Sequence, residues 1–590
     1  MESSHPSEPP AQNWFHRPWV MELVACGITA LANLGTLAFG FVYDDVPQIL
    51  KNPAIQDWRY LPQYFTSHVW AAIYPNSAGN YYRPLFLLWL RLNYALFGTD
   101  PAGWHWTSVL CHVAATYLIF RVAQQLTRDR MTAFAAALLF GLHPAHIENV
   151  AWISGVTDPL MACFVLGSCS AFLRFRESRK VWQLGLSLGS FVMALLAKET
   201  AIVLPLLIFE LSRIRPQSEN QGDDVPPKAV AAIREAALYI LFALIYLGVR
   251  FWALHGFSHP AISLSWTQVL LTWPAVLWFY ARHLFLPIGL SEFYALNYLD
   301  HATGRGFWLP LAMLAIVALV SCSWVRALSQ RRAAWFAVTL IVLPLLPVLD
   351  LRSLTAGDIV HDRYLYLPSV GFVLLVALSL REIERRMPSF RAVSLLLAGT
   401  GLIALLFAVL TLTQQRQWTN DIQLYTRGVE SAPDNLTARD NLANALLAAN
   451  QPERAIPMYL EVLKRNPGFW RSNYNLGFAY YKLGNPAAAE NYLERAIQID
   501  RSDSDEFIYL ALVELQLKKL PEAAENARQA IARNPKARGY HFALGLIEEA
   551  RGDRNAAIAA FKAEVTEHPD DAPAAAELQK IEGIPASPQP

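Results

Sequence analysis

Cysteine and charged residues are both scarce in this sequence of 590 residues. Its five cysteines all lie within apolar stretches, where cysteine usually packs as a small hydrophobic side chain, so a disulfide-based scaffold is excluded. Charged residues make up only 16% of the chain, against about 25% in soluble domains, and hydrophobic residues make up 54%. The formal net charge is +1, which gives no argument for binding nucleic acid.

The common catalytic signatures are also missing. The sequence has no Walker loop, no dinucleotide-binding fingerprint and no nucleophile elbow. His146 and Glu148 lie two residues apart, a spacing that matches no zinc signature such as His-Glu-x-x-His. The sequence therefore predicts no metal site.

Charge is distributed unevenly along the chain. Residues 1–410 contain 53 charged residues, whereas the 180 residues of 411–590 contain 44. The first part has the composition of a membrane protein and the second that of a soluble domain. A membrane-spanning helix needs about 20 mostly apolar residues. About eleven such stretches are predicted, approximately at 18–41, 104–122, 131–146, 157–174, 181–198, 200–214, 235–252, 306–325, 333–349, 364–382 and 392–413.

The predicted fold class is all-α, with a polytopic membrane helix bundle in 18–413 and a repeat array after a connector at 414–435. Two further apolar stretches, 84–98 and 266–288, each contain an arginine and are interpreted as interfacial or re-entrant helices. The polar N-terminus, 1–17, is expected to be disordered and cytoplasmic.

Lysine and arginine indicate the orientation in the membrane. Of the 29 such residues in 1–410, 19 lie on one side of the predicted topology. Because positively charged loops stay in the cytoplasm, the N-terminus is expected there. An odd number of crossings then places the C-terminal array in the periplasm, or in the lumen of the endoplasmic reticulum if the source is eukaryotic.

The C-terminal part repeats with an exact period. Pro433, Pro467, Pro535 and Pro569 are separated by multiples of 34 residues, and small residues recur with the same spacing. This period is typical of tetratricopeptide repeats, in which small residues let paired helices pack closely. The sequence predicts four units over 436–570, followed by a capping helix and a disordered tail in 571–590. Such arrays stack into a solenoid with a concave binding face.

Ionisable residues gather on the expected outer side of the bundle, at the ends of predicted spans. Charged groups in or beside a membrane are costly and therefore tend to be functional. Asp44 and Asp45 are adjacent, and their repulsion can raise the pKa of one carboxyl and leave the other as a base. Arg83 could bind a phosphate with its planar donor group. The remaining candidates are His143, His146, Glu148, Asp158, Lys198, Glu199, Asp362 and Arg363.

Most candidates also have a purely structural interpretation. The two aspartates could form a helix-ending turn, and Arg83 could anchor the chain at the membrane interface. Either histidine could be a satisfied core residue. Lys198 and Glu199 could form a buried ion pair. Asp362 could be an acidic residue at a helix N-terminus, and Arg363 an interface anchor.

The motifs follow one another in a definite order. They are Asp44-Asp45, Tyr-Arg-Pro-Leu at 82–85, His-Pro-x-His-x-Glu at 143–148, Trp-Ile-Ser-Gly-x-x-Asp at 152–158, Lys-Glu at 198–199 and Asp-Arg-Tyr-Leu-Tyr-Leu-Pro at 362–368, then the repeats. This order resembles the transmembrane and tetratricopeptide-repeat O-mannosyltransferase family or its bacterial relatives. The resemblance extends from about Phe41 to Asp570 and implies the GT-C glycosyltransferase architecture.

The resemblance implies an inverting transfer of a sugar, mannose in this family, from a polyprenyl-phosphate carrier to Ser or Thr hydroxyls of an extracytoplasmic protein. In that architecture an acidic residue of the first outer loop is catalytic, a role that falls to Asp44 or Asp45. Arg83, Lys198 and Arg363 are the cations available for the donor phosphate. The other candidates would form a supporting polar site, and the repeat groove would hold the acceptor protein. No cofactor is implied beyond the lipid-linked donor, although a divalent metal stays open.

Two other functions fit parts of the sequence. A membrane-anchored scaffold would use the repeats to bind protein partners, but a single span would be enough to anchor it. A transporter for lipid-linked saccharides would place charged residues near the middle of the membrane, in broken helices. Here the charged residues gather at one membrane surface, which argues against a transporter.

Overall fold

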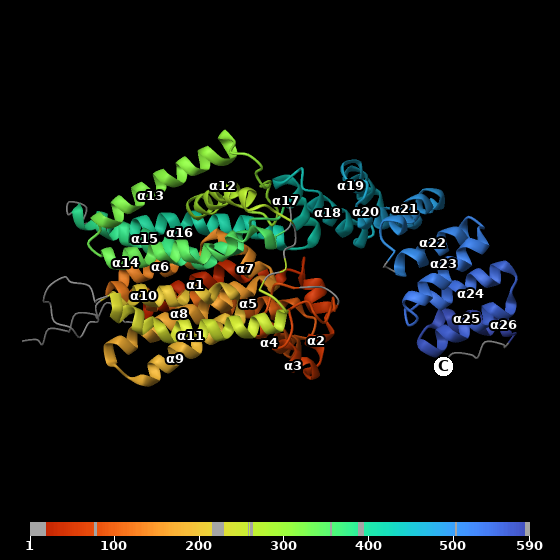
Figure 1. Cartoon of the computed structure of the whole chain (residues 1–590), viewed down its shortest axis with the longest axis horizontal. Coiled ribbons are helices and arrows are strands. Elements are labelled where there is room, and N and C mark those ends of the chain that lie inside the picture. The colour runs from red at the N-terminus through yellow and green to blue at the C-terminus, as the bar shows by residue number, and fades with distance from the viewer. Residues whose placement is uncertain are drawn as a thin grey trace, which may run out of the picture. The chain divides into compact units, whose positions relative to one another are not determined.

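The computed structural model describes residues 19–75, 79–214, 229–257, 259, 263–354, 357–387, 394–501 and 504–583. These residues form helices and turns without a β-strand, which confirms the predicted all-α fold class. The chain divides into two compact units, 1–427 and 428–590, within the predicted connector (Figure 1). The expected disordered segment 1–17 and the last seven residues of the expected tail lie outside the described part of the chain.

Eight helical segments in the described part of the first unit are long and apolar enough to cross a membrane, and each overlaps a predicted span. Their principal helices are α1 (Val20–Asn33), α5 (Pro101–Thr127), α8 (Thr157–Ser178), α11 (Ala229–Leu254), α13 (Leu309–Ala327), α14 (Arg331–Val342), α15 (Tyr366–Arg386) and α16 (Leu395–Gln414).

The other three predicted spans fall on shorter helices, α6 (Arg130–Gly141), α9 (Val181–Ala197) and α10 (Leu204–Ser212). A hydropathy pattern counts apolar residues but does not show where the backbone turns. The helix α6 ends early because His143 is extended and Pro144 cannot continue a helix. These three helices are shorter than the predicted spans, and their crossing of the membrane stays a prediction.

The two apolar stretches that contain arginine form α4 (Pro84–Phe97) and α12 (Trp266–Phe285). The 14 residues of α4 are too few to cross a bilayer, and α12 contains Pro274. Their proposed interfacial or re-entrant position stays a prediction.

Small residues determine how closely the central helices pack. Ala133, Ala135 and Ala136 of α6 are at most 1% exposed, and α6 packs against α5 and α15. At Gly371 of α15 an added Cβ would lie 2.1 Å from the carbonyl oxygen of Ala337 on α14. A side chain is excluded there because the two backbones are in direct contact.

Short helices and turns connect the long helices at the end of the unit where the candidate residues lie. They include η3 (Val46–Leu50), α2 (Pro53–Gln56), η4 (Trp58–Tyr60), α3 (Leu61–Tyr64), η5 (Pro144–His146), α7 (Ile147–Ala151), η6 (Ile153–Val156), η7 (Glu199–Val203) and η12 (Asp362–Leu365). In Figure 1, α2, α3 and α4 mark this end. Segments far apart in the sequence therefore contribute side chains to one region.

The second unit is a series of helix pairs. After α17 (Asp421–Ser431), which contains the division between the units, come α18 (Leu436–Ala448), α19 (Pro452–Arg465), α20 (Trp470–Lys482), α21 (Pro486–Ile499), α22 (Ser504–Gln516), α23 (Leu520–Arg533), α24 (Tyr540–Arg551), α25 (Arg554–Glu567) and α26 (Ala572–Glu582). Consecutive helices pack against one another along the series.

The small residues of the 34-residue period lie inside these pairs. An added Cβ at Gly477 would lie 2.7 Å from Leu493, and one at Gly545 would lie 2.4 Å from Phe561. The predicted solenoid is therefore confirmed, because the recurring small residues sit where two helices approach most closely.

Candidate active site

A cavity of about 70 Å³ lies among the short elements of the first unit. Four of the sequence-predicted residues, Asp44, Arg83, Lys198 and Arg363, line it together. The rest of the lining consists of Gln48, Val69, Trp70, Tyr81, Phe86, Trp152, Ser154, Thr157 and Tyr364. Three cations and a single acidic residue face this space, so the lining favours an anionic ligand.

The two adjacent aspartates have different surroundings. The carboxylate of Asp45 is fully buried and accepts hydrogen bonds from the Ser154 backbone N–H at 2.8 Å, the Ser154 hydroxyl at 2.6 Å and the Val42 N–H at 3.3 Å. Asp44 is half-buried and lines the cavity, and among the described residues no hydrogen bond to its carboxylate is found. Asp45 therefore holds the turn in place, and Asp44 is available to a ligand.

A strained turn directly precedes the two carboxylates. Tyr43 has φ 55°, in the left-handed region that non-glycine residues rarely adopt, and its backbone N–H donates to Asp421 at 2.8 Å. Its ring packs on Trp152, with ring centroids 5.4 Å apart. These contacts fix the turn that presents Asp44 to the cavity.

Burial raises the pKa of both aspartates. The pKa of Asp44 rises to about 6, because the effect of burial exceeds the opposing effect of the Arg363 guanidinium. The pKa of Asp45 rises to about 7, because burial outweighs the hydrogen bonds from Ser154. A carboxyl group with a pKa near 6 can both accept and release a proton near neutral pH, as a general base requires.

Each of the three cations is paired with another candidate residue. Arg83 binds Glu199 through two hydrogen bonds, Nε–Oε2 at 3.0 Å and Nη2–Oε1 at 2.6 Å. The ammonium of Lys198 lies 2.6 Å from Asp158, and both side chains are almost completely buried. Arg363 binds Glu148 through its guanidinium and through its backbone N–H.

These pairs set the charge and orientation of the cations. Burial would raise the pKa of Glu199, but the Arg83 guanidinium outweighs it and holds that pKa at about 2. Glu148 and Asp158 do not line the cavity, whereas the cations that they bind, Arg363 and Lys198, do. The two carboxylates therefore lie behind the cations as seen from the cavity. The pairs therefore present fixed positive groups to the space beside Asp44.

Aromatic rings complete the wall of the cavity. The Arg83 guanidinium lies 4.5 Å from the centre of the Tyr81 ring, and the Lys198 ammonium lies 5.0 Å from that of Tyr364. Such contacts attract a cation and hold it over the ring face.

Three predicted residues lie elsewhere. His143 accepts from the Ala145 N–H and contacts the Leu284 carbonyl, so it caps η5. His146 contacts the Ser369 hydroxyl at 2.7 Å among buried aromatic rings. Asp362 contacts His283 at 2.9 Å and accepts from the Tyr294 hydroxyl. None of the three lines the cavity, and their part in a supporting polar site stays a prediction.

Two family models match the chain. Residues 82–217 match the model described as dolichyl-phosphate-mannose-protein mannosyltransferase, and residues 441–504 and 510–572 match a tetratricopeptide-repeat model. Protein O-mannosyl-transferase Tmtc1 of Drosophila melanogaster is 28% identical over 539 residues, covering 76% of this chain and 62% of that protein. Protein O-mannosyl-transferase TMTC3 of Mus musculus is 24% identical over 564 residues, covering 88% of this chain and 60% of that protein.

The chain resembles the transmembrane and tetratricopeptide-repeat O-mannosyltransferase family over most of its length. The resemblance predicted from the order of the motifs is therefore confirmed. With eight long apolar helices in the described part of the chain, the protein is an integral membrane protein. The chain spans about three fifths of the length of the curated relatives it matches, 62% and 60% for the two proteins above. A solved tetratricopeptide-repeat protein of Thermus thermophilus is 18% identical, covering 29% of this chain and 92% of that chain, with a TM-score of 0.25.

Residues 82–217, which match the mannosyltransferase model, contain only part of the cavity lining. Arg83 and Lys198 lie within 82–217, whereas Asp44 and Arg363 lie outside it. The tertiary structure joins them in one cavity.

Sequence reasoning missed two residues beside the cavity. Glu292 and His361 are at most 1% exposed and lie next to Glu148, behind Arg363. Burial, together with the neighbouring carboxylates, raises the pKa of Glu148 and of Glu292 to about 8. Glu292 lies four residues after the apolar stretch 266–288 and His361 three residues before the stretch 364–382, so both lie close to the signal that selected the other candidates.

A second cavity of about 210 Å³ adjoins the first, since Tyr81 and Tyr364 line both. Its other lining residues are Asn80, Glu199, Thr200, Arg250, Phe257, Pro347, Val348, Asp350, Ser353 and Leu354. The Arg83–Glu199 pair separates the two spaces, with Arg83 lining the smaller and Glu199 the larger.

Proposed function

We propose that the protein is an inverting O-mannosyltransferase, which moves mannose from a polyprenyl-phosphate carrier to Ser or Thr hydroxyls of an extracytoplasmic protein. One observation supports this most directly. Asp44, with a pKa raised to about 6, faces the same cavity as Arg83, Lys198 and Arg363. A base beside an anion-binding group of cations is what transfer of a phosphate-linked sugar requires.

The donor binds through its phosphate. Arg83 and Arg363 offer planar guanidinium groups that match phosphate oxygens, and Lys198 adds a compact charge. The adjoining cavity of about 210 Å³ has both apolar and polar lining residues and offers room for a further part of the donor. The prenyl tail stays in the bilayer.

The reaction is a direct displacement. The acceptor hydroxyl oxygen attacks the anomeric carbon while the carboxylate of Asp44 takes the hydroxyl proton. The bond between the anomeric carbon and the phosphate oxygen breaks, and its electron pair leaves with the phosphate. The three cations stabilise the charge that develops on the leaving phosphate. Attack from the opposite side inverts the anomeric configuration.

The distribution of positive charge supports an extracytoplasmic site. The loops with most lysine and arginine connect the opposite ends of the spans from those that carry Asp44 and Arg363. The N-terminus is then cytoplasmic, and the repeat array lies in the periplasm or in the lumen of the endoplasmic reticulum.

The repeat array binds the acceptor protein. Helices α20 and α22 carry a half-buried aromatic cluster in which Phe478 and Tyr481 pack on Tyr509, with ring centroids 4.7 and 6.1 Å apart. Aromatic side chains dominate the energetics of many protein-binding surfaces. Capture of an extended segment by the array would raise its effective concentration for transfer.

Substitution of Asp44 tests this function. Cells that lack the protein are complemented with the wild type, with Asp44→Asn or with the control Asp300→Asn, an exposed carboxylate outside both cavities. Glycoproteomics should find mannosylated peptides with the wild type and the control, but not with Asp44→Asn at equal protein level. Mannosylation by Asp44→Asn at the wild-type level would remove Asp44 from the proposed role.

The donor is tested separately with purified protein. Polyprenyl-phosphate mannose should be consumed in the presence of an acceptor peptide identified by the glycoproteomics, with release of polyprenyl phosphate. Nucleotide-linked mannose should not be consumed. Consumption of the nucleotide-linked sugar alone would contradict the proposed carrier.

A further inference from the structure

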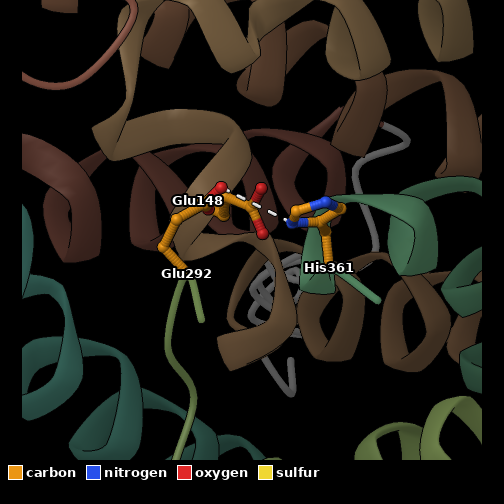
Figure 2. A group of neighbouring side chains, drawn as sticks. All are labelled: Glu148, Glu292 and His361. Carbon is orange, nitrogen blue, oxygen red and sulfur yellow. Dashed lines mark ion pairs between the residues drawn. The ribbon is translucent and has the colours of Figure 1, made fainter. Parts of the chain in front are cut away.

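Three side chains from distant elements direct potential metal ligands toward one another behind the candidate active site. Glu148 belongs to α7, Glu292 lies between α12 and η8 (Gly304–Trp308), and His361 directly precedes η12. One ligand atom from each lies within 4.8 Å of the others, and all three residues are at most 3% exposed. Figure 2 shows the two carboxylates and the imidazole ring pointing toward a common point.

Two of the ligand atoms have no hydrogen-bond partner. Oε2 of Glu292 and Nδ1 of His361 are both buried, and no donor or acceptor for either is found in the described part of the chain. Leaving a buried polar atom unsatisfied destabilises the folded protein. A ligand that both atoms bind would remove this cost.

The spacing fits a metal ion. Nδ1 of His361 lies 3.4 Å from Oε1 of Glu292. Two ligands bound at about 2.1 Å in a tetrahedral arrangement lie about 3.4 Å apart. The observed separation therefore needs little adjustment to accept an ion between the two groups.

The local charge also favours a cation. The guanidinium of Arg363 contacts both Glu148 and Glu292, so a single positive group faces two carboxylates. A third carboxylate, Asp358, lies 3.5 Å from Nε2 of His361. Three carboxyl groups thus lie around one guanidinium, and a divalent cation would add positive charge where the side chains supply little of it.

Asp358 also has the position of a supporting residue. A histidine that binds a metal through one ring nitrogen usually donates its other N–H to a carboxylate, which fixes the tautomer and orients the ring. In His361, Nδ1 faces Glu292 and Nε2 faces Asp358, which is the required arrangement.

We propose that Glu148, Glu292 and His361 bind one divalent transition-metal cation, Mn²⁺ or Zn²⁺. Both ions accept carboxylate oxygen and imidazole nitrogen together. The site stands independently of mannosyl transfer, because it rests on the geometry of these three residues. The bound ion would also attract the carboxylates of Glu148 and Glu292. The Arg363 guanidinium, which contacts both, would then be more available to a ligand in the cavity.

Metal content of the full-length protein tests the site. Purified protein is stripped with a chelator, dialysed against Mn²⁺ or Zn²⁺ and then against metal-free buffer, and its metal is measured by mass spectrometry. We expect about one ion per chain in the wild type and its loss in Glu292→Gln and His361→Ala. Asp358→Asn should weaken binding about 10- to 100-fold. Glu382→Gln and His301→Ala, which alter a carboxylate and an imidazole outside the group, should bind like the wild type.

A second measurement needs no variant. Pulsed electron paramagnetic resonance of wild-type protein loaded with Mn²⁺ should show coupling to one imidazole nitrogen. A wild type that retains no ion above the level of Glu292→Gln, or bound Mn²⁺ without nitrogen coupling, would overturn the proposal. In that case bound protons, and not a metal ion, would neutralise the carboxylates of this group.

Discussion

Replacement of Lys198 by methionine separates the structural role of a buried ion pair from its proposed role in donor binding. The Lys198 side chain is 2% exposed, that of Asp158 is 5% exposed, and the ammonium lies 2.6 Å from the carboxylate. The substitution keeps most of the side-chain volume but leaves the Asp158 carboxylate buried without its cation.

The expected loss of stability follows from these contacts. Removing one partner of a buried ion pair typically costs about 3–5 kcal/mol, because an uncompensated charge stays behind. Asn149 still donates a hydrogen bond to Asp158 at 3.2 Å, so we expect a value near the lower end, about 3 kcal/mol. The double variant Lys198→Met/Asp158→Asn should recover most of this loss, since neither charge is then buried alone.

The free energy of unfolding of the three variants is measured in detergent by titration with denaturant. The control is Arg59→Met, which breaks an exposed ion pair of similar length, 2.7 Å, and should leave the transition unchanged. If Lys198→Met cost less than about 1 kcal/mol, or if the double variant were as unstable as the single one, the reasoning from burial would be refuted. Mannosyl transfer by the stable double variant then reports on donor binding alone, and we expect it to stay impaired.

Two further predictions concern the base and the packing of the bundle. Burial raises the pKa of Asp44 to about 6, so its basic form is lost as the pH falls through that value. Initial transfer rates at saturating donor should therefore fall about tenfold for each pH unit below 6, and a flat profile between pH 5 and 7 would contradict Asp44 as the base. At Gly371, alanine would place a Cβ 2.1 Å from the Ala337 carbonyl oxygen, so Gly371→Ala should destabilise the protein by about 1–3 kcal/mol. Gly185→Ala, where an added Cβ meets no atom within 4 Å, is the matched control in the same unfolding measurement.

Local pattern was sufficient to predict most of the architecture. Long apolar runs identify α5, α8 and α15 as spans, because a helix satisfies its own backbone hydrogen bonds and needs only apolar side chains to enter a bilayer. The 34-residue period predicts the helix pairs, because Gly477 and Gly545 mark the points where a larger side chain would collide with a neighbouring helix. Apolar composition alone failed for 131–146, where Pro144 ends the helix before the run ends.

The candidate residues were found from one local property, an ionisable group beside an apolar stretch, but their roles depend on the tertiary structure. Asp44 and Asp45 are neighbours in sequence and cannot be distinguished by pattern. Only the fold places Ser154, 109 residues away, on Asp45 and leaves Asp44 facing the cavity.

The sequence by itself determined the helical class, the repeat array and most of the charged groups at the site, since these follow from composition and periodicity along the chain. The tertiary structure alone decided which groups meet. Arg363 pairs with Glu148 across 215 positions of the chain, and Glu292 joins them from a third segment. Such contacts depend on how the helices pack, because electrostatic and hydrogen-bond energies depend on distance in space and not on separation along the chain.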